Sequence, residues 1–341
     1  MKSAVSNSLG NEARADGLIK AWLVVVALMI VAMVVVGGAT RLTGSGLSIT
    51  EWQPISGALP PFNEADWQTL FEKYQQSSQY KLQNSGMAIS DFKFIFWWEW
   101  AHRLLGRTVG LVFFVPLLGF LLTRKIERRH LPHLFGIFVL GGLQGALGWY
   151  MVASGLVDRV EVSQYRLSAH LTLATILLAA VVWTTYSISQ RHQKPRTLNQ
   201  WVALVLPALV VLQIAAGAFV AGLNAGQGYN TWPLMDGQFI PNGLLAMDPV
   251  WHNFFESAIT VQFQHRMLAY VILALVLWHG ARAQTLSALL LVCAVLGQVC
   301  LGILTLLTQV PLGLALAHQL GAMLVLIVAL WNLHRQTAVQ A

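Results

Sequence analysis

The feature that most constrains this chain is a series of apolar runs, each about twenty residues long. A run of this length crosses the hydrocarbon core of a bilayer as one helix. The runs lie near residues 18–38, 95–122, 134–153, 168–189, 201–223, 262–280, 286–307 and 314–333. Because 56% of the 341 residues are hydrophobic and only 10% are charged, we predict an all-α integral membrane protein with eight transmembrane helices.

Basic residues cluster in short connections between the apolar runs. Lys or Arg occurs at positions 2, 14 and 20, at 124, 125, 128 and 129, at 191, 194 and 196, and again at 282 and 335. The connection 224–261 has no Lys or Arg, and the connection 39–94 has only four. The positive-inside rule therefore predicts that both termini are cytoplasmic and that these two long connections are external. Since topology accounts for the net charge of +7, we exclude nucleic-acid binding.

An internal repeat relates the two halves of the chain. The segment WEWAHRLLGR from Trp98 matches VQFQHRMLAY from Val261, and SAHLTLA around His170 matches LAHQLGA around His318. Each copy holds an even number of spans, so the copies are expected to be parallel, with equivalent residues at equal depth. We predict two pseudo-symmetric four-helix bundles, formed by residues 1–190 and 191–341.

Each repeat carries two histidines in the first turns of helices that enter from the external side. They are His102 and His170 in the first half, and His265 and His318 in the second. A membrane histidine is costly without a partner. Two imidazoles that converge without a cysteine or a second carboxylate favour axial ligation of haem iron over tetrahedral zinc. A hydrogen bond to a neighbouring helix is the alternative for any one of them, but four matched positions favour haem.

Two further sets of residues have less specific patterns. Gln–Gly pairs four residues apart would let a flat macrocycle approach a helix backbone, with ordinary helix packing as the alternative; they are Gln144/Gly148, Gln213/Gly217 and Gln298/Gly302. His279 and His334 follow His265 and His318 on the same helices. They could hold a second, inner haem, but their places beside Arg282 and Arg335 favour an interfacial position.

The halves differ at Glu99, which corresponds to Gln262 in the second copy. Glu99 lies three residues before His102 and therefore on the same helical face. A carboxylate among tryptophans is suited to act as an acid or base, and an ion pair with Arg103 is the alternative. We expect proton chemistry in the first half and electron transfer in the second.

Three arginines near the outer interface are candidate anchors for haem propionates, with lipid phosphates as the competing partners. They are Arg103, Arg107 and Arg266.

Two other features concern the periphery of the chain. The external segment NEADWQTLFEKY places Trp67, Leu70, Phe71 and Tyr74 at helical spacing behind an acidic first turn, which predicts an amphipathic helix that covers the outer surface as a lid or lies there without a catalytic role. Cys293 and Cys300 lie inside an apolar run, so we expect buried thiols and no disulfide.

Long motifs now identify a family. GGATRLTGSGLSITEWQPISGALPP, then EWAHRLLGR, TVQFQHRMLAY and AHQLGAM occur in this order over nearly the whole chain. This pattern resembles the haem A synthase family, in its mitochondrial and proteobacterial branch. The resemblance implies oxidation of the C8 methyl of haem O to a formyl group by successive hydroxylations. It also implies that His102 and His170 flank haem O, that His265 and His318 ligate a haem B cofactor, and that Glu99 lies at the reacting methyl.

The same resemblance implies a setting and partners. The protein is expected in the bacterial inner membrane, with its haem sites towards the periplasm. Expected partners are haem O, membrane lipid and an electron donor that the sequence does not identify. Haem O synthase, cytochrome oxidase assembly factors and a second copy of the chain are further candidates.

Two other functions would use a similar chain. A non-enzymatic di-haem cytochrome b that exchanges electrons with quinone needs four histidines, but it pairs them along the same helices, and His102 has no such partner. A haem or substrate transporter would also be built from repeats, but parallel copies with ligands near one face do not favour alternating access.

Overall fold

Eight long helices dominate the computed structural model, which describes residues 2–53, 55–156, 160–188, 190 and 192–338. They are α1 (Lys2–Leu42), α4 (Ile89–Leu122), α5 (Leu131–Gly155), α6 (Gln164–Ser187), α7 (Leu198–Gly222), α9 (Ala258–Ala283), α10 (Leu286–Leu307) and α11 (Leu312–Thr337). Each contains a stretch long and apolar enough to cross a membrane and overlaps one predicted run. The predicted all-α architecture with eight transmembrane helices is confirmed.

The remaining elements are short and lie in the connections. They are η1 (Ser56–Ala58), α2 (Glu64–Gln75), α3 (Ser78–Leu82), η2 (Arg128–His130), η3 (Ala225–Gln227), η4 (Val250–His252) and α8 (Asn253–Glu256). Local chemistry sets the start of α7, where Thr197 and Gln200 form a capping box. Such reciprocal bonds satisfy backbone N–H groups that the first helical turn leaves unpaired.

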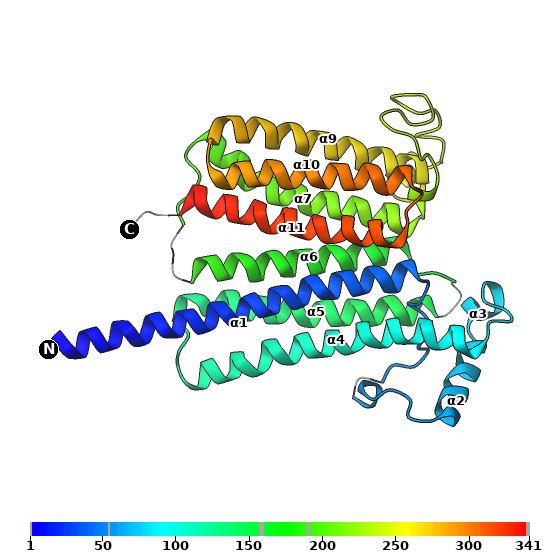
Figure 1. Ribbon diagram of the computed structural model, residues 1–341, viewed down its shortest axis with the longest axis horizontal. Helices are drawn as coiled ribbons and strands as arrows, with labels where there is room; N and C mark the ends of the chain where they lie inside the picture. The colour runs from blue at the N-terminus through cyan, green and yellow to red at the C-terminus, as the bar shows by residue number, and fades with distance from the viewer. Residues whose placement is uncertain (1, 54, 157–159, 189, 191, 339–341) are drawn as a thin grey trace.

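The long helices form two neighbouring groups of four (Figure 1). In the first, α1 contacts α4 and α6, and α5 contacts α4 and α6; in the second, α7 contacts α9 and α11, and α10 contacts α9 and α11. The groups meet where α6 contacts α7 and α11, and where α1 contacts α11. The helices therefore contact one another in the same order in both groups, while the pseudo-symmetry of the two bundles and the domain boundary near residue 190 stay predictions.

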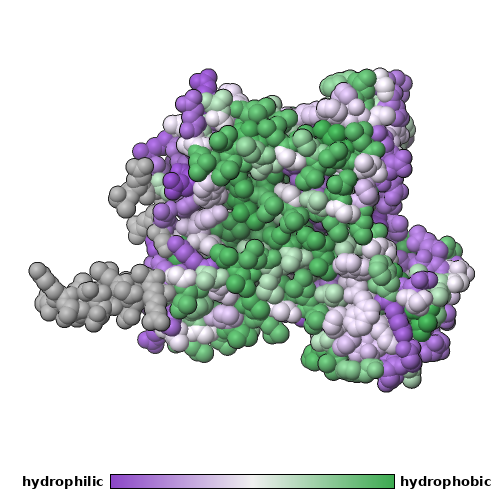
Figure 2. Space-filling model, in the orientation of Figure 1, coloured by the Kyte–Doolittle hydropathy of each residue, from purple (hydrophilic) through white to green (hydrophobic). Residues whose placement is uncertain are grey.

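Apolar side chains cover the middle of the molecule. Figure 2 shows hydrophobic residues across the central part of this face and hydrophilic ones towards both ends. Both termini lie at one end, and the connections that hold α2 and α3 and that follow α7 lie at the other (Figure 1). This arrangement fits a multi-pass membrane protein whose two long connections share one side.

The amphipathic helix predicted in the first connection is α2, and the pattern that predicted it is confirmed. Asn63 caps it by accepting the N–H of Asp66, and its buried face is made of Trp67, Phe71 and Tyr74. These side chains pack on Phe92 of α4, with ring centroids 5.2 Å apart for both Phe71 and Tyr74. The connection is thus fastened to α4, the helix that carries His102.

Tyr74 also joins α2 to the chain that follows it. Its hydroxyl donates to Gln79 at 3.0 Å and accepts from Asn84 at 2.7 Å. Burial raises the pKa of Tyr74 above the ordinary value. The phenol therefore stays protonated and keeps both hydrogen bonds at neutral pH.

Two expectations about individual residues are wrong. Cys293 and Cys300 are free thiols, but both are exposed on the surface of α10 instead of buried. His279 and His334 are not interfacial, because they are only 0% and 8% exposed. His279 Nε2 lies 2.9 Å from the amide nitrogen of Asn332, and His334 Nδ1 lies 2.7 Å from Nε2 of His192. One ring nitrogen of each imidazole thus contacts a protein group, while Nδ1 of His279 has no hydrogen-bond partner among the described residues, so nothing here tests the inner haem.

Replacing Phe92 should detach α2 from α4. Because Phe92 is fully buried, we expect Phe92→Ala to weaken this docking by about 3–5 kcal/mol and to expose residues 64–82 to protease. Phe94→Ala is the matched control, since Phe94 lies two residues away and is 57% exposed. Limited proteolysis of the purified protein measures the effect, and equal cleavage rates in the two variants would contradict it.

Candidate functional site

The four matched histidines lie on α4, α6, α9 and α11, the second and fourth long helices of each group. His102 is close enough to His170, and His265 to His318, for their charges to interact. These are the two pairs that the repeat predicts, and their role as haem ligands stays a prediction.

Each histidine ring stands against a glycine of a neighbouring helix. A Cβ atom added to the glycine would lie 2.7–3.1 Å from Cε1 of the ring, closer than the ring could tolerate without moving. The pairs are Gly37 with His102, Gly148 with His170, Gly217 with His265 and Gly302 with His318. The glycines therefore make room for the imidazoles. This role differs from both roles predicted for the Gln–Gly pairs, the approach of a macrocycle and ordinary helix packing.

Three of the histidines are also held by a glutamine one turn before the glycine. The side-chain amides of Gln144, Gln213 and Gln298 donate to the backbone carbonyls of His170, His265 and His318, at 3.1, 3.0 and 2.8 Å. The same amide nitrogens lie 3.1–3.2 Å from Nδ1 of these rings. For His170 and His265 the amide nitrogen also lies 3.3 Å from Nε2. Each glutamine thus bonds to the backbone of one histidine and packs against its ring.

The fourth histidine lacks this support. The residue one turn before Gly37 is Met33, whose Cε lies 3.2 Å from the position that a Cβ on Gly106 would take. Nδ1 of His102 is buried and has no hydrogen-bond partner among the described residues. Gly37 and Met33 were not among the candidate residues, although alignment of GGATRL with the end of α7 pairs them with Gly217 and Gln213 in the repeat.

Glu99 forms the ion pair that was the alternative to a catalytic role. Its carboxylate is 2% exposed, and one oxygen accepts from Nε and Nη2 of Arg103 at 3.1 and 2.7 Å. The other oxygen accepts from the Ser48 hydroxyl at 2.7 Å and the Ile49 N–H at 2.8 Å. The carboxylate thus joins α4 to the connection that follows α1.

The second half repeats this arrangement with an amide. Gln262 is 3% exposed, donates to the carbonyls of Ala225 and Gly228 at 2.9 and 3.1 Å, and accepts from Arg266 at 3.2 Å. Both arginines donate to backbone carbonyls of the preceding connection. Arg103 binds those of Ile49 and Glu51, and Arg266 binds those of Tyr229 and Thr231.

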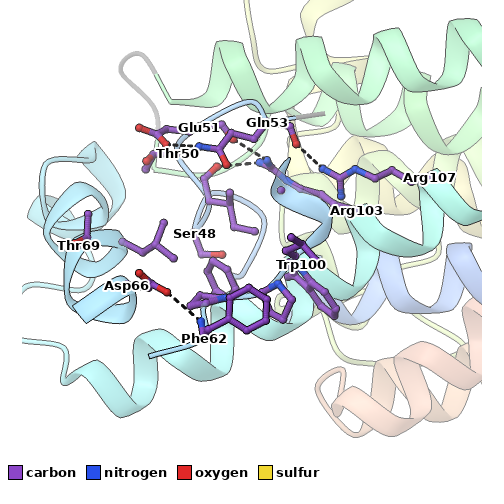
Figure 3. A pocket seen from close by; sticks show the side chains of 17 residues that line it. Ser48, Thr50, Glu51, Gln53, Phe62, Asp66, Thr69, Trp100, Arg103 and Arg107 are labelled. Carbon is purple, nitrogen blue, oxygen red and sulfur yellow. Dashed lines mark hydrogen bonds between the residues drawn. The ribbon is translucent and has the colours of Figure 1, made fainter. Parts of the chain in front are cut away.

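A hollow of about 330 Å³ opens beside Arg103 and Arg107, between α2, α4 and the first connection. Figure 3 shows both guanidinium groups on one side of it, with Arg107 bonded to Gln53. Nη2 of Arg107 donates to the Gln53 carbonyl at 2.8 Å. Two of the three predicted arginines therefore meet here, whereas Arg266 lies in the other half.

The residues present fit a bis-histidine haem. The imidazoles come in two pairs, and no group of three or more metal-ligating side chains occurs among the described residues, as a tetrahedral zinc site would require. Nε of Arg266 is buried without a hydrogen-bond partner in the described part of the chain. Such groups are expected where a bound ligand completes the hydrogen bonding.

Enlarging one glycine should disturb the histidine that it faces. A Cβ on Gly302 would meet His318 at 2.8 Å, so Gly302→Val should displace the ring and lower haem affinity at this pair by at least about tenfold. Gly297→Val on the same helix is the control, because nothing lies within 4 Å of its Cβ position. Haem titration of the purified variants measures the difference in affinity. Equal affinities would refute the role of Gly302 in making room for the His318 ring.

Comparisons with known proteins agree with this geometry. Residues 20–330 match the family model of COX15-CtaA, cytochrome oxidase assembly protein. The heme A synthase of Parvibaculum lavamentivorans is 56% identical over 319 residues, which cover 92% of this chain and 93% of that protein. The heme A synthase of Azorhizobium caulinodans is 54% identical over 93% of this chain and 94% of its own length. The chain therefore belongs to the haem A synthase family of cytochrome oxidase assembly proteins.

Proposed function

We propose that the chain is a haem A synthase, a membrane oxidoreductase that converts the C8 methyl of haem O to a formyl group by successive hydroxylations and loss of water. The observation that carries the proposal is the pairing of His102 with His170, and of His265 with His318, in a chain with relatives of that name. Two equivalent pairs allow one haem to be substrate and the other to be cofactor.

The C-terminal half is proposed to hold haem B between His265 and His318. Both histidines are fixed by glutamines, and both rings are seated against glycines. Haem B held by these residues would supply one-electron transfer. The N-terminal half, with His102 and His170, is the proposed site of haem O.

Glu99 is the proposed proton-handling residue of the substrate half. It lies one turn from His102, and it is an acid where the cofactor half has Gln262. Its bonds to Arg103, Ser48 and Ile49 hold the carboxylate in one orientation. The Glu99 carboxylate can therefore accept or release a proton at a fixed place beside the haem, provided that its ion pair with Arg103 opens or shares the proton.

Arg103, Arg107 and Arg266 are the proposed propionate anchors. The buried Nε of Arg266 has no partner among the described residues, so it can donate to a propionate without breaking an existing bond. Arg103 and Arg107 flank the hollow at the external end of α4. They would bind a carboxylate there while keeping their bonds to the first connection.

The proposed setting is the bacterial inner membrane, with both termini cytoplasmic and both haem sites towards the periplasm. The charge distribution along the connections supports this orientation. Membrane lipid, haem O synthase, oxidase assembly factors, a second copy of the chain and an electron donor of unknown identity remain the proposed partners.

Changing Glu99 to glutamine tests its role. Glu99→Gln keeps the side-chain shape, and Gln262 occupies the same place in the second half. We expect haem binding to persist and haem A yield to fall at least about a hundredfold. Glu51→Gln removes a carboxylate from the connection that follows α1 and should keep the wild-type yield. An unimpaired haem A yield in Glu99→Gln would remove Glu99 from the mechanism.

Haem extraction and mass analysis test the overall proposal. The protein is purified from cells with and without a haem O synthase. We expect the formyl-bearing haem A only when haem O is supplied, with haem B bound in both cases. Recovery of haem B alone under both conditions, from a reducible preparation, would instead identify an electron-transfer cytochrome b.

A further inference from the structure

The Glu99 carboxylate is separated from the external hollow by its own hydrogen-bond partners. Glu99 is 2% exposed and is not one of the residues that line the hollow. Its three partners, Ser48, Ile49 and Arg103, all line it. Figure 3 shows the Ser48 and Arg103 side chains at the hollow. The shortest path for a proton between Glu99 and the hollow therefore passes through one of these three groups.

Only one of the three groups can pass a proton on. The guanidinium of Arg103 is not deprotonated in proteins, and the backbone N–H of Ile49 keeps its proton as well. A serine hydroxyl has one O–H donor and two acceptor lone pairs, so it can give a proton to one neighbour and take another from a second. The Ser48 hydroxyl lies 2.7 Å from Glu99 and 3.3 Å from the Ile95 carbonyl. Its hydrogen therefore has a second acceptor when the carboxylate is protonated.

The second half lacks both the acid and the hydroxyl. Gln262 corresponds to Glu99, and Gly228 lies 180 positions after Ser48. The same offset relates the carbonyls that the arginine next to the first histidine binds in each half. Gln262 donates to the Gly228 carbonyl at 3.1 Å, so the two positions are in contact in both halves. The acid and the hydroxyl therefore occur together only in the half that is proposed to act on the substrate.

The hollow can supply protons to Ser48. Its volume of about 330 Å³ has room for several water molecules. Two of its lining residues, Leu59 and Phe62, are 66% and 75% exposed, so the hollow reaches the surface. The carboxylates of Glu51 and Asp66 line it together with the two arginines described above. Water and small anions can therefore approach the Ser48 hydroxyl from the external side.

We propose that Ser48 is a positioning residue that relays protons between Glu99 and water in the external hollow. In one transfer, the O–H bond of Ser48 breaks as its proton passes to Glu99, and a new O–H bond forms with a proton from a water molecule. Release of a proton from Glu99 follows the same path in reverse. One proton moves and no electron is transferred. The inference rests on the proposed role of Glu99 as the proton-handling residue.

Removing the hydroxyl tests the relay. Ser48→Ala and Ser48→Gly keep the Ile49 N–H that bonds to Glu99, and glycine is the residue at this position in the second half. We expect both variants to keep their bound haem and to form haem A at least about tenfold more slowly. Ser48→Thr, which restores a hydroxyl, should approach the wild-type rate. Thr69→Val is the matched control, because Thr69 lines the same hollow and its hydroxyl donates to the Ala65 carbonyl instead.

A soluble proton carrier distinguishes a relay from a purely structural hydrogen bond. Haem A formation is measured in membrane vesicles with the external side outwards, prepared from cells that also express haem O synthase. Phosphate or sulfate is added to a bulky buffer at equal pH and ionic strength. Phosphate carries an exchangeable proton near neutral pH, whereas sulfate is an anion of similar size that carries none. Phosphate should therefore raise the rate of Ser48→Ala as its concentration increases, and sulfate should not.

The outcomes separate this inference from the proposed function. If Glu99→Gln is inactive while Ser48→Ala and Ser48→Gly form haem A at the wild-type rate, the relay alone is overturned. Equal rates of Ser48→Ala in phosphate and sulfate, or loss of bound haem from Ser48→Gly, would show a structural role and overturn the relay as well. An unimpaired haem A yield in Glu99→Gln would overturn the role of Glu99 and the relay together.

Discussion

The structure depends on how a polar ring is accommodated inside apolar helices. An imidazole at membrane depth needs space and hydrogen-bond partners, because lipid offers neither. Here a glycine on the adjacent helix provides the space, and at three of the four positions a glutamine one turn away donates to the backbone carbonyl of the histidine and packs against its ring. The contacts α1–α4, α5–α6, α7–α9 and α10–α11 are therefore fixed by the same residues that orient the histidines. Helix packing and site geometry cannot be changed separately.

Run length and repetition made much of this predictable. Eight apolar runs of sufficient length predict eight helices, and the repeat predicts which histidines meet. The partners of Glu99 could not be found in this way, because Ser48 and Ile49 reach it only through the path of the connection. Gly37 and Met33 were missed because nothing local shows that α1 faces His102. The cysteines were placed wrongly because apolar side chains face lipid and protein alike, so hydropathy does not separate the two surfaces.

The halves differ in small ways on a common plan. Glu99 stands where the second half has Gln262, and Met33 stands where it has Gln213, and both differences lie in the half that carries His102. Other features are the same in both halves, including the glycines that lie against the histidine rings and the arginines that follow the first histidine of each pair. A single α4 carries Glu99, His102 and the aromatic support for α2. In the first half, α4 thus links the external connection directly to the proposed substrate site.

The arginine contacts have a consequence for how such a chain can diverge. Arg103 donates to the main-chain carbonyls of Ile49 and Glu51. Arg266 donates to those of Tyr229 and Thr231. Every residue has a backbone carbonyl, so these hydrogen bonds depend on the path of the backbone and not on the identity of the residue. The two external connections can therefore accumulate substitutions, and acquire partner-specific surfaces, without loosening the helices beneath them. Their sequences would be expected to drift apart faster than their shapes.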